Sequence, residues 1–180
     1  YIYWGAPAQN RTALLRAAET GNLAEAKNLI ELKGIDANVQ DSGGNSPLLI
    51  AASKGQLEFV QYLISSKNVS ATQKNNSDEG AIHFAAASGN LELTRYLVDS
   101  AKVDPTEKTK DGETALHWAA RSGSLEVLKY LIFDKKLDVN SKTVKILESP
   151  LHWASKFGKL DVVAFLIDTV QMDPTIKNSE

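Results

Sequence analysis

The chain has 180 residues, of which 43% are hydrophobic and 23% charged, so it can bury a sizeable core and lies far from the disordered class. Its formal net charge of -2 gives no global field that would attract nucleic acid or an anionic membrane surface. It contains no cysteine, which excludes disulfides, thiolate metal sites and cysteine nucleophiles, and its longest apolar run, 162–167, is far shorter than the about 20 residues of a membrane span.

The chain begins with a flank that has no initiator methionine and lacks the basic segment and long apolar core of a secretion signal. We therefore expect the sequence to be cut from a longer protein. The aromatic residues Tyr1, Tyr3 and Trp4 leave two alternatives open. They either cover the open side of the first helical unit or belong to an upstream domain.

From residue 10 onward the sequence repeats itself. Five glycines, each followed by a polar or small residue and then a leucine, are spaced by 34, 34, 34 and 35 residues. Two further columns share this register, and three columns that agree indicate an internal repeat. The columns are the glycines Gly21, Gly55, Gly89, Gly123 and Gly158, the leucines Leu29, Leu63, Leu97, Leu131 and Leu166, and the turn positions Thr12, Ser46, Gly80, Thr114 and Ser149.

The period sets the boundaries of the units. It divides the chain into an N-terminal flank (1–9), five repeats (10–42, 43–76, 77–110, 111–144 and 145–176) and a tail or the start of a further hairpin (177–180). The segment 172–175, Met-Asp-Pro-Thr, closely matches Val-Asp-Pro-Thr at 103–106. We therefore expect the native protein to continue past Glu180.

Each unit carries the pattern of two helices. Alanine-rich stretches before the glycine predict first helices whose small side chains allow close packing, at 14–18, 48–52, 82–86, 116–120 and 151–155. After the glycine, apolar residues recur at a helical period, as at Leu125, Leu128 and Leu131, which predicts a second, amphipathic helix. The 10 to 15 polar residues between units predict a projecting turn.

Glycine between the two helices suits a left-handed backbone, where a Cβ atom is penalised. The residue that follows it begins the second helix, and Asn22, Asn90 and Ser124 are expected to cap that helix. Gln56 and Lys159 hold the same position and are poor caps. A single helix pair leaves both of its flanks in water, so we expect stability to come from stacking.

Two segments resemble the signature of a known repeat family. Residues 114–120, Thr-Ala-Leu-His-Trp-Ala-Ala, and 149–154, Ser-Pro-Leu-His-Trp-Ala, resemble the Thr-Pro-Leu-His-x-Ala signature of ankyrin repeats. The resemblance extends from residue 10 to about 176. It implies an all-α ankyrin-repeat solenoid of stacked helix-turn-helix units with projecting hairpin-like turns. It also implies a concave groove that binds another protein or peptide.

The sequence departs from the family pattern at some positions. The signature histidine is Leu15 in the first unit and Leu49 in the second, and Gly-Ala at 80–81 replaces Thr-Pro in the third. The fifth hairpin, 143–148, has one extra residue and lacks Asp-Gly. These departures affect individual turns and leave the predicted fold unchanged.

Three histidines, His83, His117 and His152, raise the alternative of a metal or catalytic site. Equivalent positions on stacked helices lie about 8–10 Å apart, whereas zinc ligands lie about 2.0–2.1 Å from one metal ion. The resemblance implies that they bond backbone groups of neighbouring turns. The sequence also has no nucleophile elbow, phosphate-binding loop or zinc-protease motif. We therefore predict no catalytic site, no metal and no cofactor.

The resemblance places partner binding on the hairpin tips and on the exposed side of the first helices. Phe157 stands where water is expected, and two interpretations are equally favoured: a binding anchor, or packing against the apolar fifth hairpin. Trp118 and Trp153 are interpreted as core residues. The candidate partner-binding residues are Lys54, Lys110, Asp111, Glu113, Arg121, Lys145, Ile146, Leu147, Lys156 and Phe157.

The charges of these candidates give only a faint preference. The lysines and Arg121 suggest an acidic peptide, but Asp111, Glu113 and Glu148 lie among them. Our first hypothesis is a non-catalytic, intracellular scaffold, cytoplasmic or alternatively nuclear, that binds a protein or peptide. The alternative is the recruiting or regulatory segment of a larger enzyme, transporter or pathogen effector, and a nucleic-acid reader is a distant third.

Overall fold

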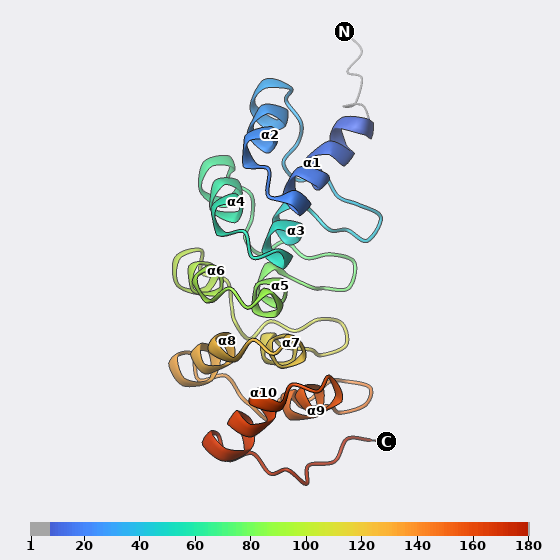
Figure 1. Cartoon of the computed structure of the whole chain (residues 1–180). Coiled ribbons are helices and arrows are strands. Elements are labelled where there is room, and N and C mark those ends of the chain that lie inside the picture. The colour runs from blue at the N-terminus through green and yellow to red at the C-terminus, as the bar shows by residue number, and fades with distance from the viewer. Residues whose placement is uncertain (1–7, 180) are drawn as a thin grey trace.

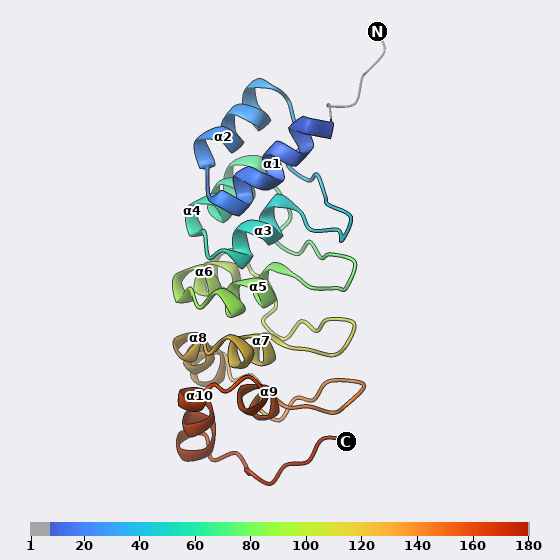
Figure 2. The ribbon, with the colours of Figure 1, turned by 45° about the vertical axis from the view of Figure 1, so that its right-hand side comes forward.

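Helix pairs stack in one direction to form an elongated array, as the computed structural model of the chain shows (Figure 1). The structure describes residues 8–179, so Tyr1, Tyr3 and Trp4 lie outside the described part of the chain. The first helix of each pair belongs to one row and the second helix to the other, and the loops between units project beside the first row (Figure 2). This arrangement confirms the predicted all-α solenoid.

The two rows differ in the regularity of their helices. The first row consists of α1 (Ala8–Thr20), α3 (Pro47–Ser53), α5 (Ala81–Ser88), α7 (Ala115–Ser122) and α9 (Pro150–Lys156). The second row consists of α2 (Leu23–Lys27), α4 (Leu57–Gln61), α6 (Leu91–Arg95), α8 (Leu125–Lys129) and α10 (Leu160–Ala164). Each second-row helix continues as a wider π-helical turn: Asn28–Leu32, Tyr62–Ser66, Tyr96–Ser100, Tyr130–Asp134 and Phe165–Thr169. None of the described helices is both long and apolar enough to cross a membrane.

Local signals account for most of the helix boundaries. All five inter-helix glycines have left-handed backbones, with φ between 67 and 78°. The side chains of Asn22 and Asn90 accept the N–H of the residue three positions later, at 3.1 and 3.0 Å, so both predicted caps are confirmed. The predicted cap at Ser124 is wrong, because its hydroxyl bonds the hydroxyl of Ser122 at 2.7 Å instead.

The first helix also begins earlier than predicted. Thr12 was expected to mark the turn before it, but α1 already starts at Ala8 and Thr12 lies inside the helix. The Thr12 hydroxyl donates to the carbonyl of Ala8 at 3.0 Å, one helical turn back. The alanine and glutamine at its start favour the helix, and no residue there breaks it.

The core runs continuously along the array between the two rows. The predicted leucine column supplies its centre, since Leu63, Leu97, Leu131 and Leu166 are completely buried and Leu29 almost so. Alanines of the first row pack against it and let neighbouring helices approach closely, as Ala85, Ala86 and Ala119 do. Each unit therefore buries its flanks against its neighbours, which is where a repeat array obtains its stability.

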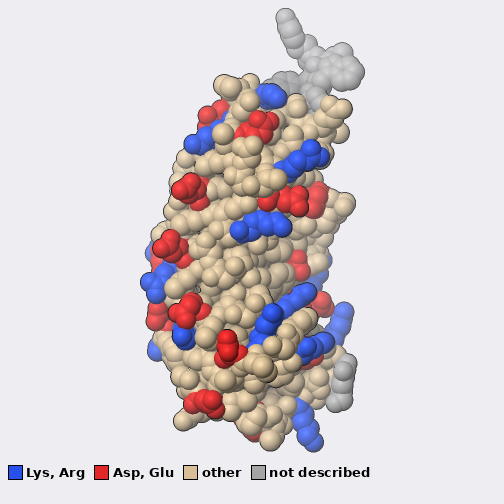
Figure 3. Space-filling model, in the orientation of Figure 1, with Lys and Arg blue, Asp and Glu red and all other residues tan. Residues whose placement is uncertain are grey.

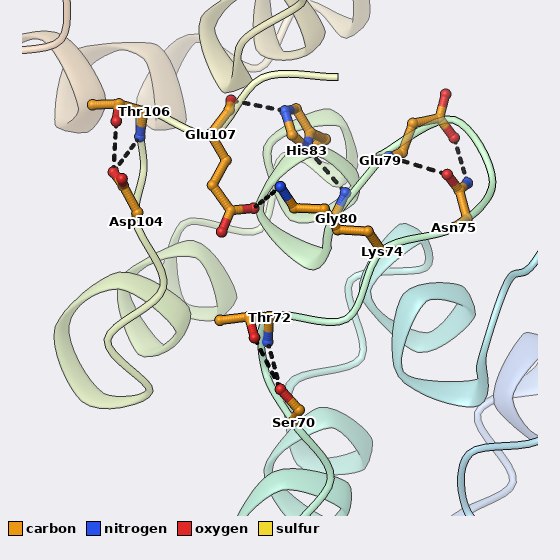
Figure 4. A network of polar contacts seen from close by, with 10 residues as sticks. All are labelled: Ser70, Thr72, Lys74, Asn75, Glu79, Gly80, His83, Asp104, Thr106 and Glu107. Atoms are coloured by element: carbon orange, nitrogen blue, oxygen red, sulfur yellow. Dashed lines mark hydrogen bonds and ion pairs between the residues drawn. The ribbon is translucent and has the colours of Figure 1, made fainter. Parts of the chain in front are cut away.

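The signature histidines tie each hairpin to the next. In each ring Nδ1 accepts the backbone N–H three residues earlier, at 3.0 to 3.1 Å, so Nε2 carries the proton and donates to the next hairpin. The acceptors are the carbonyls of Glu107, Glu148 and Ile176, at 2.9 to 3.0 Å. Figure 4 shows His83 between Gly80 and Glu107. The structural role that the resemblance implied for these rings is thus confirmed.

Main-chain hydrogen bonds also join the tips of successive hairpins. One bond links each pair of neighbouring tips: Asn76 N to Gly43 O, Lys110 N to Ser77 O, Val144 N to Asp111 O and Ser179 N to Ile146 O, at 2.8 to 3.1 Å. The last of these shows that residues 172–179 follow the path of a further hairpin. Thr175 bonds Asp173 as Thr106 bonds Asp104, with matching distances of 2.8 and 2.7 Å.

Gly112 lies where two hairpin tips meet, and its replacement tests that contact. Its φ is +77°, and an added Cβ would lie 2.7 Å from Val144 Cγ2 and 3.1 Å from the Val144 backbone nitrogen. We expect Gly112→Ala to lower the free energy of unfolding by about 2–3 kcal/mol, through left-handed strain plus the clash. Urea unfolding followed by circular dichroism measures this loss.

Gly34 provides the matched control. Its φ of +65° is equally left-handed, but no atom lies within 4 Å of an added Cβ. Gly34→Ala should therefore cost only the backbone strain, about 1 kcal/mol. Equal losses in the two variants would show that the tip contact adds nothing to stability.

Candidate peptide-binding groove

Several hollows lie along residues 8–179, and three of them contain predicted binding residues. The N-terminal hollow, about 440 Å³, lies between α1 and α3 and is lined by Thr12, Leu15, Arg16, Glu19, Asp41, Ile50, Ser53 and Lys54. The C-terminal hollow, about 420 Å³, is lined by Ala87, Trp118, Arg121, Ser122, Phe157 and Lys159. The hairpin cavity, about 200 Å³, is lined by Asp111, Glu113, Thr143, Lys145, Ile146, Glu148 and Trp153.

The structure distributes the predicted binding residues among these hollows. Lys54 lies in the N-terminal hollow, Arg121 and Phe157 in the C-terminal hollow, and Asp111, Glu113, Lys145 and Ile146 in the hairpin cavity. The remaining three, Lys110, Leu147 and Lys156, line none of the three. The candidates are therefore spread over three separate hollows and the residues around them, and they do not converge on a single point.

Phe157 is the exposed aromatic of the C-terminal hollow. It follows α9, is 42% exposed, and its ring lies beneath the guanidinium of Arg121, 5.0 Å from the ring centroid. On its other side the ring contacts Trp153, with the centroids 6.2 Å apart. A cation over an aromatic face is attracted by the ring quadrupole. Two units thus present one composite aromatic and cationic surface.

The buried aromatics behave as core residues, as the sequence indicated. Trp118 is 9% exposed and packs edge-on against Phe84 of the preceding unit, with centroids 5.2 Å apart. Its Nε1 donates to Glu113 Oε2 at 2.9 Å. Burial raises the pKa of Glu113 despite this hydrogen bond. The carboxylate therefore faces the hairpin cavity from a site where its charge is poorly solvated.

Most of the basic candidates already have partners within the chain. Lys156 Nζ lies 3.5 Å from Glu148 Oε1, Lys145 Nζ lies 3.3 Å from Asp111 Oδ1, and Lys110 Nζ donates to the Asn76 carbonyl. On the face drawn in Figure 3, basic and acidic side chains are interspersed along the array. These contacts weaken the preference for an acidic peptide that the sequence suggested.

One functional feature was missed by sequence reasoning. Trp153 is buried as predicted, but its Nε1 donor has no hydrogen-bond partner among the described residues. The sequence gives no signal for this, because Glu148 stands at the same spacing from Trp153 as Glu113 from Trp118. In the structure Glu148 pairs with Lys156, whereas Glu113 accepts from the indole of Trp118.

The described residues contain no group of three or more histidine, aspartate or glutamate side chains that could hold a metal ion. A family model for ankyrin repeats in three copies matches residues 4–75 and 67–143, and a model for the single ankyrin repeat matches residues 147–179. A comparison with curated proteins gives no match. Ankyrin repeats are generally protein–protein interaction modules. Because these matches span nearly the whole chain, it belongs to the ankyrin repeat family.

Proposed function

We propose that the chain is a non-catalytic scaffold that holds a peptide segment of another protein in its groove, anchored at the C-terminal hollow. The observation that carries this proposal is the surface formed by Phe157 and Arg121. Aromatic residues and arginine dominate the binding energy of protein interfaces. The charge pattern supports a protein partner over nucleic acid, since acidic and basic residues are interspersed on the face drawn in Figure 3 and three carboxylates line the hairpin cavity beside Lys145.

Rigidity supports the same proposal. The groove wall is fixed by main-chain bonds between hairpin tips and by the three histidines, so little ordering remains to be done when a peptide binds. Such preorganisation raises affinity by lowering the entropic cost of association. Both ring nitrogens of each histidine are engaged in this framework, which supports a role in structure and none in proton transfer.

Selection from a displayed library of random peptides, followed by affinity measurement on the selected peptides, tests the proposal. We expect Phe157→Ala and Arg121→Glu each to weaken binding by about tenfold or more, while helical circular dichroism is kept.

Phe133 supplies the matched control. It is 43% exposed, almost the same as Phe157, but it belongs to the second row and packs against Phe165 with centroids 5.8 Å apart. Phe133→Ala should leave peptide binding within about twofold of the wild type. Peptides that tolerate Phe157→Ala but lose affinity with Phe133→Ala would place the binding surface on the other row and overturn the proposal.

A further inference from the structure

A buried indole in the fifth unit has an unused hydrogen-bond donor. Trp153 is 7% exposed, and its Nε1 is shielded from solvent without an acceptor in residues 8–179. Buried donors in native proteins are almost always paired, because an unpaired one loses its hydration without compensation. The same side chain lines the hairpin cavity. An unpaired donor in the wall of a cavity points to a ligand.

The preceding unit shows the same position with its hydrogen bond made. There the indole of Trp118 donates to Glu113, five residues earlier, at 2.9 Å. Glu148 is also five residues before Trp153, but its Oε1 lies 3.5 Å from Lys156 Nζ. The carboxylate that matches Glu113 in sequence is therefore engaged by a lysine on the next helical turn.

The two carboxylates have different partners because the cation three residues after each tryptophan makes different contacts in the two units. Arg121 follows Trp118 and lies over the ring of Phe157, so it leaves the carboxylate of its own unit to the indole. Lys156 follows Trp153, and no aromatic ring competes for it among its described contacts. Glu148 thus has two possible partners, a lysine at the surface and a group inside the cavity.

The charges that line the hairpin cavity favour a cationic ligand. Three carboxylates line it, from Asp111, Glu113 and Glu148, against the single lysine Lys145, which pairs with Asp111. Glu148 is 6% exposed and Glu113 half-buried, so an added positive charge meets poorly solvated carboxylates. The cavity has a volume of about 200 Å³, whereas one water molecule needs only about 10–15 Å³. The cavity is therefore large enough for a side chain.

We propose that the hairpin cavity binds an arginine side chain of the peptide that occupies the groove, an assignment that rests on the proposed function. The planar guanidinium donates to the carboxylates of Glu113 and Glu148, and the apolar stem packs against Ile146 and Trp153. Glu148 leaves Lys156 for the guanidinium and comes within reach of the indole N–H, as Glu113 is in the preceding unit.

Nuclear magnetic resonance on the whole chain tests this assignment directly. The probe is the tripeptide acetyl-Gly-Arg-Gly-amide, and its control carries citrulline, which has nearly the shape of arginine without the charge. The indole N–H signals report binding, and the Trp153 signal is assigned as the one that Trp153→Phe removes. We expect the arginine probe to shift the Trp153 signal, and the citrulline probe to leave it unchanged.

Two substitutions identify the carboxylates. Glu148→Gln and, separately, Glu113→Gln should weaken the arginine probe about tenfold, the value of a charge-assisted hydrogen bond. Glu126→Gln is the matched control, because Glu126 lies on α8 and pairs there with Lys129 at 2.9 Å. It should leave the affinity for the probe unchanged.

Each other outcome overturns the assignment. Equal shifts with arginine and citrulline would show that charge is irrelevant, and equal affinity for a lysine tripeptide would reduce the site to a general cation site. No shift of the Trp153 signal would remove the site altogether. In that last case, library peptides that still depend on Phe157 would leave the proposed groove function intact, so the two failures are distinguishable.

Discussion

Lowering the pH from 7 to 4 is expected to lower the free energy of unfolding of the array by about 6 kcal/mol. This is a large part of the total for a typical domain, which is about 5–15 kcal/mol. The cause is the pair of buried signature histidines. Desolvation by burial lowers the pKa of His83 and of His117 to about 4, from an ordinary value of 6.5. Each shift corresponds to about 3 kcal/mol.

The sign of the effect follows from proton binding. Above pH 6.5 both rings are neutral in the folded and in the unfolded chain, so stability is unaffected. Between pH 6.5 and 4 the unfolded histidines bind protons and the folded ones do not, so stability falls as the pH falls. Below about pH 4 both states are protonated and this loss levels off. Lys74 and Lys108 add to the lowering of the two pKa values, whereas Glu148 opposes it at His117.

Urea unfolding at a series of pH values, followed by circular dichroism, measures the loss. Replacing one titrating ring with a neutral amide, His117→Gln, should lower stability at pH 7 but remove about half of the pH dependence between 6.5 and 4.5. Glu107 and Glu113, whose pKa values burial raises, partly offset the loss, because as the pH falls they bind protons in the folded state before they do so in the unfolded chain. An unchanged pH dependence in the variant would show that the histidines are not responsible.

Truncation of the central leucine column is expected to cause the second large effect. Leu97 is completely buried in the third unit, and Leu97→Ala should lower the free energy of unfolding by about 2–5 kcal/mol, through lost burial and the cavity left behind. Because units stabilise one another, the loss should extend beyond the third unit. In a Trp4→Phe background, tryptophan fluorescence reports on the fourth and fifth units through Trp118 and Trp153, and its transition should therefore shift together with circular dichroism.

Leu32 is the matched control for this truncation. It ends the second-row helix of the first unit and is 82% exposed, so Leu32→Ala should change stability by no more than about 0.5 kcal/mol. Similar losses in the two leucine variants would contradict a core centred on the predicted column. A fluorescence transition that stays in place while circular dichroism shifts would show that the units unfold independently.

The sequence predicts the fold well because the fold is built from local signals that recur. Glycines that need a left-handed backbone, asparagines that cap a helix and leucines at a fixed period each act within one unit, and their repetition exposes them. The errors lie where the local context is unusual. The helix of Thr12 already starts at Ala8, and the Ser124 hydroxyl bonds the hydroxyl of Ser122 in place of the helix end.

The groove is harder to predict because its properties arise between units. The sequence marks Phe157 and Arg121 as separate candidates, but the contact that joins them across two repeats appears only in the structure. The unpaired indole of Trp153 depends on which of two partners Glu148 selects. Such choices depend on competing contacts in three dimensions, and equal spacing in the sequence makes the two units look alike.

The hairpin tips are joined through the main chain, and this has a consequence for how the protein diversifies. Asn76, Lys110 and Val144 each contribute a backbone N–H to the neighbouring tip, and every amino acid except proline has that group. The main-chain link between the loops therefore does not depend on which side chain stands there, although Asn76 and Lys110 add side-chain bonds to the neighbouring tip. A new recognition specificity can be grafted onto the wall, residue by residue, while its framework stays the same.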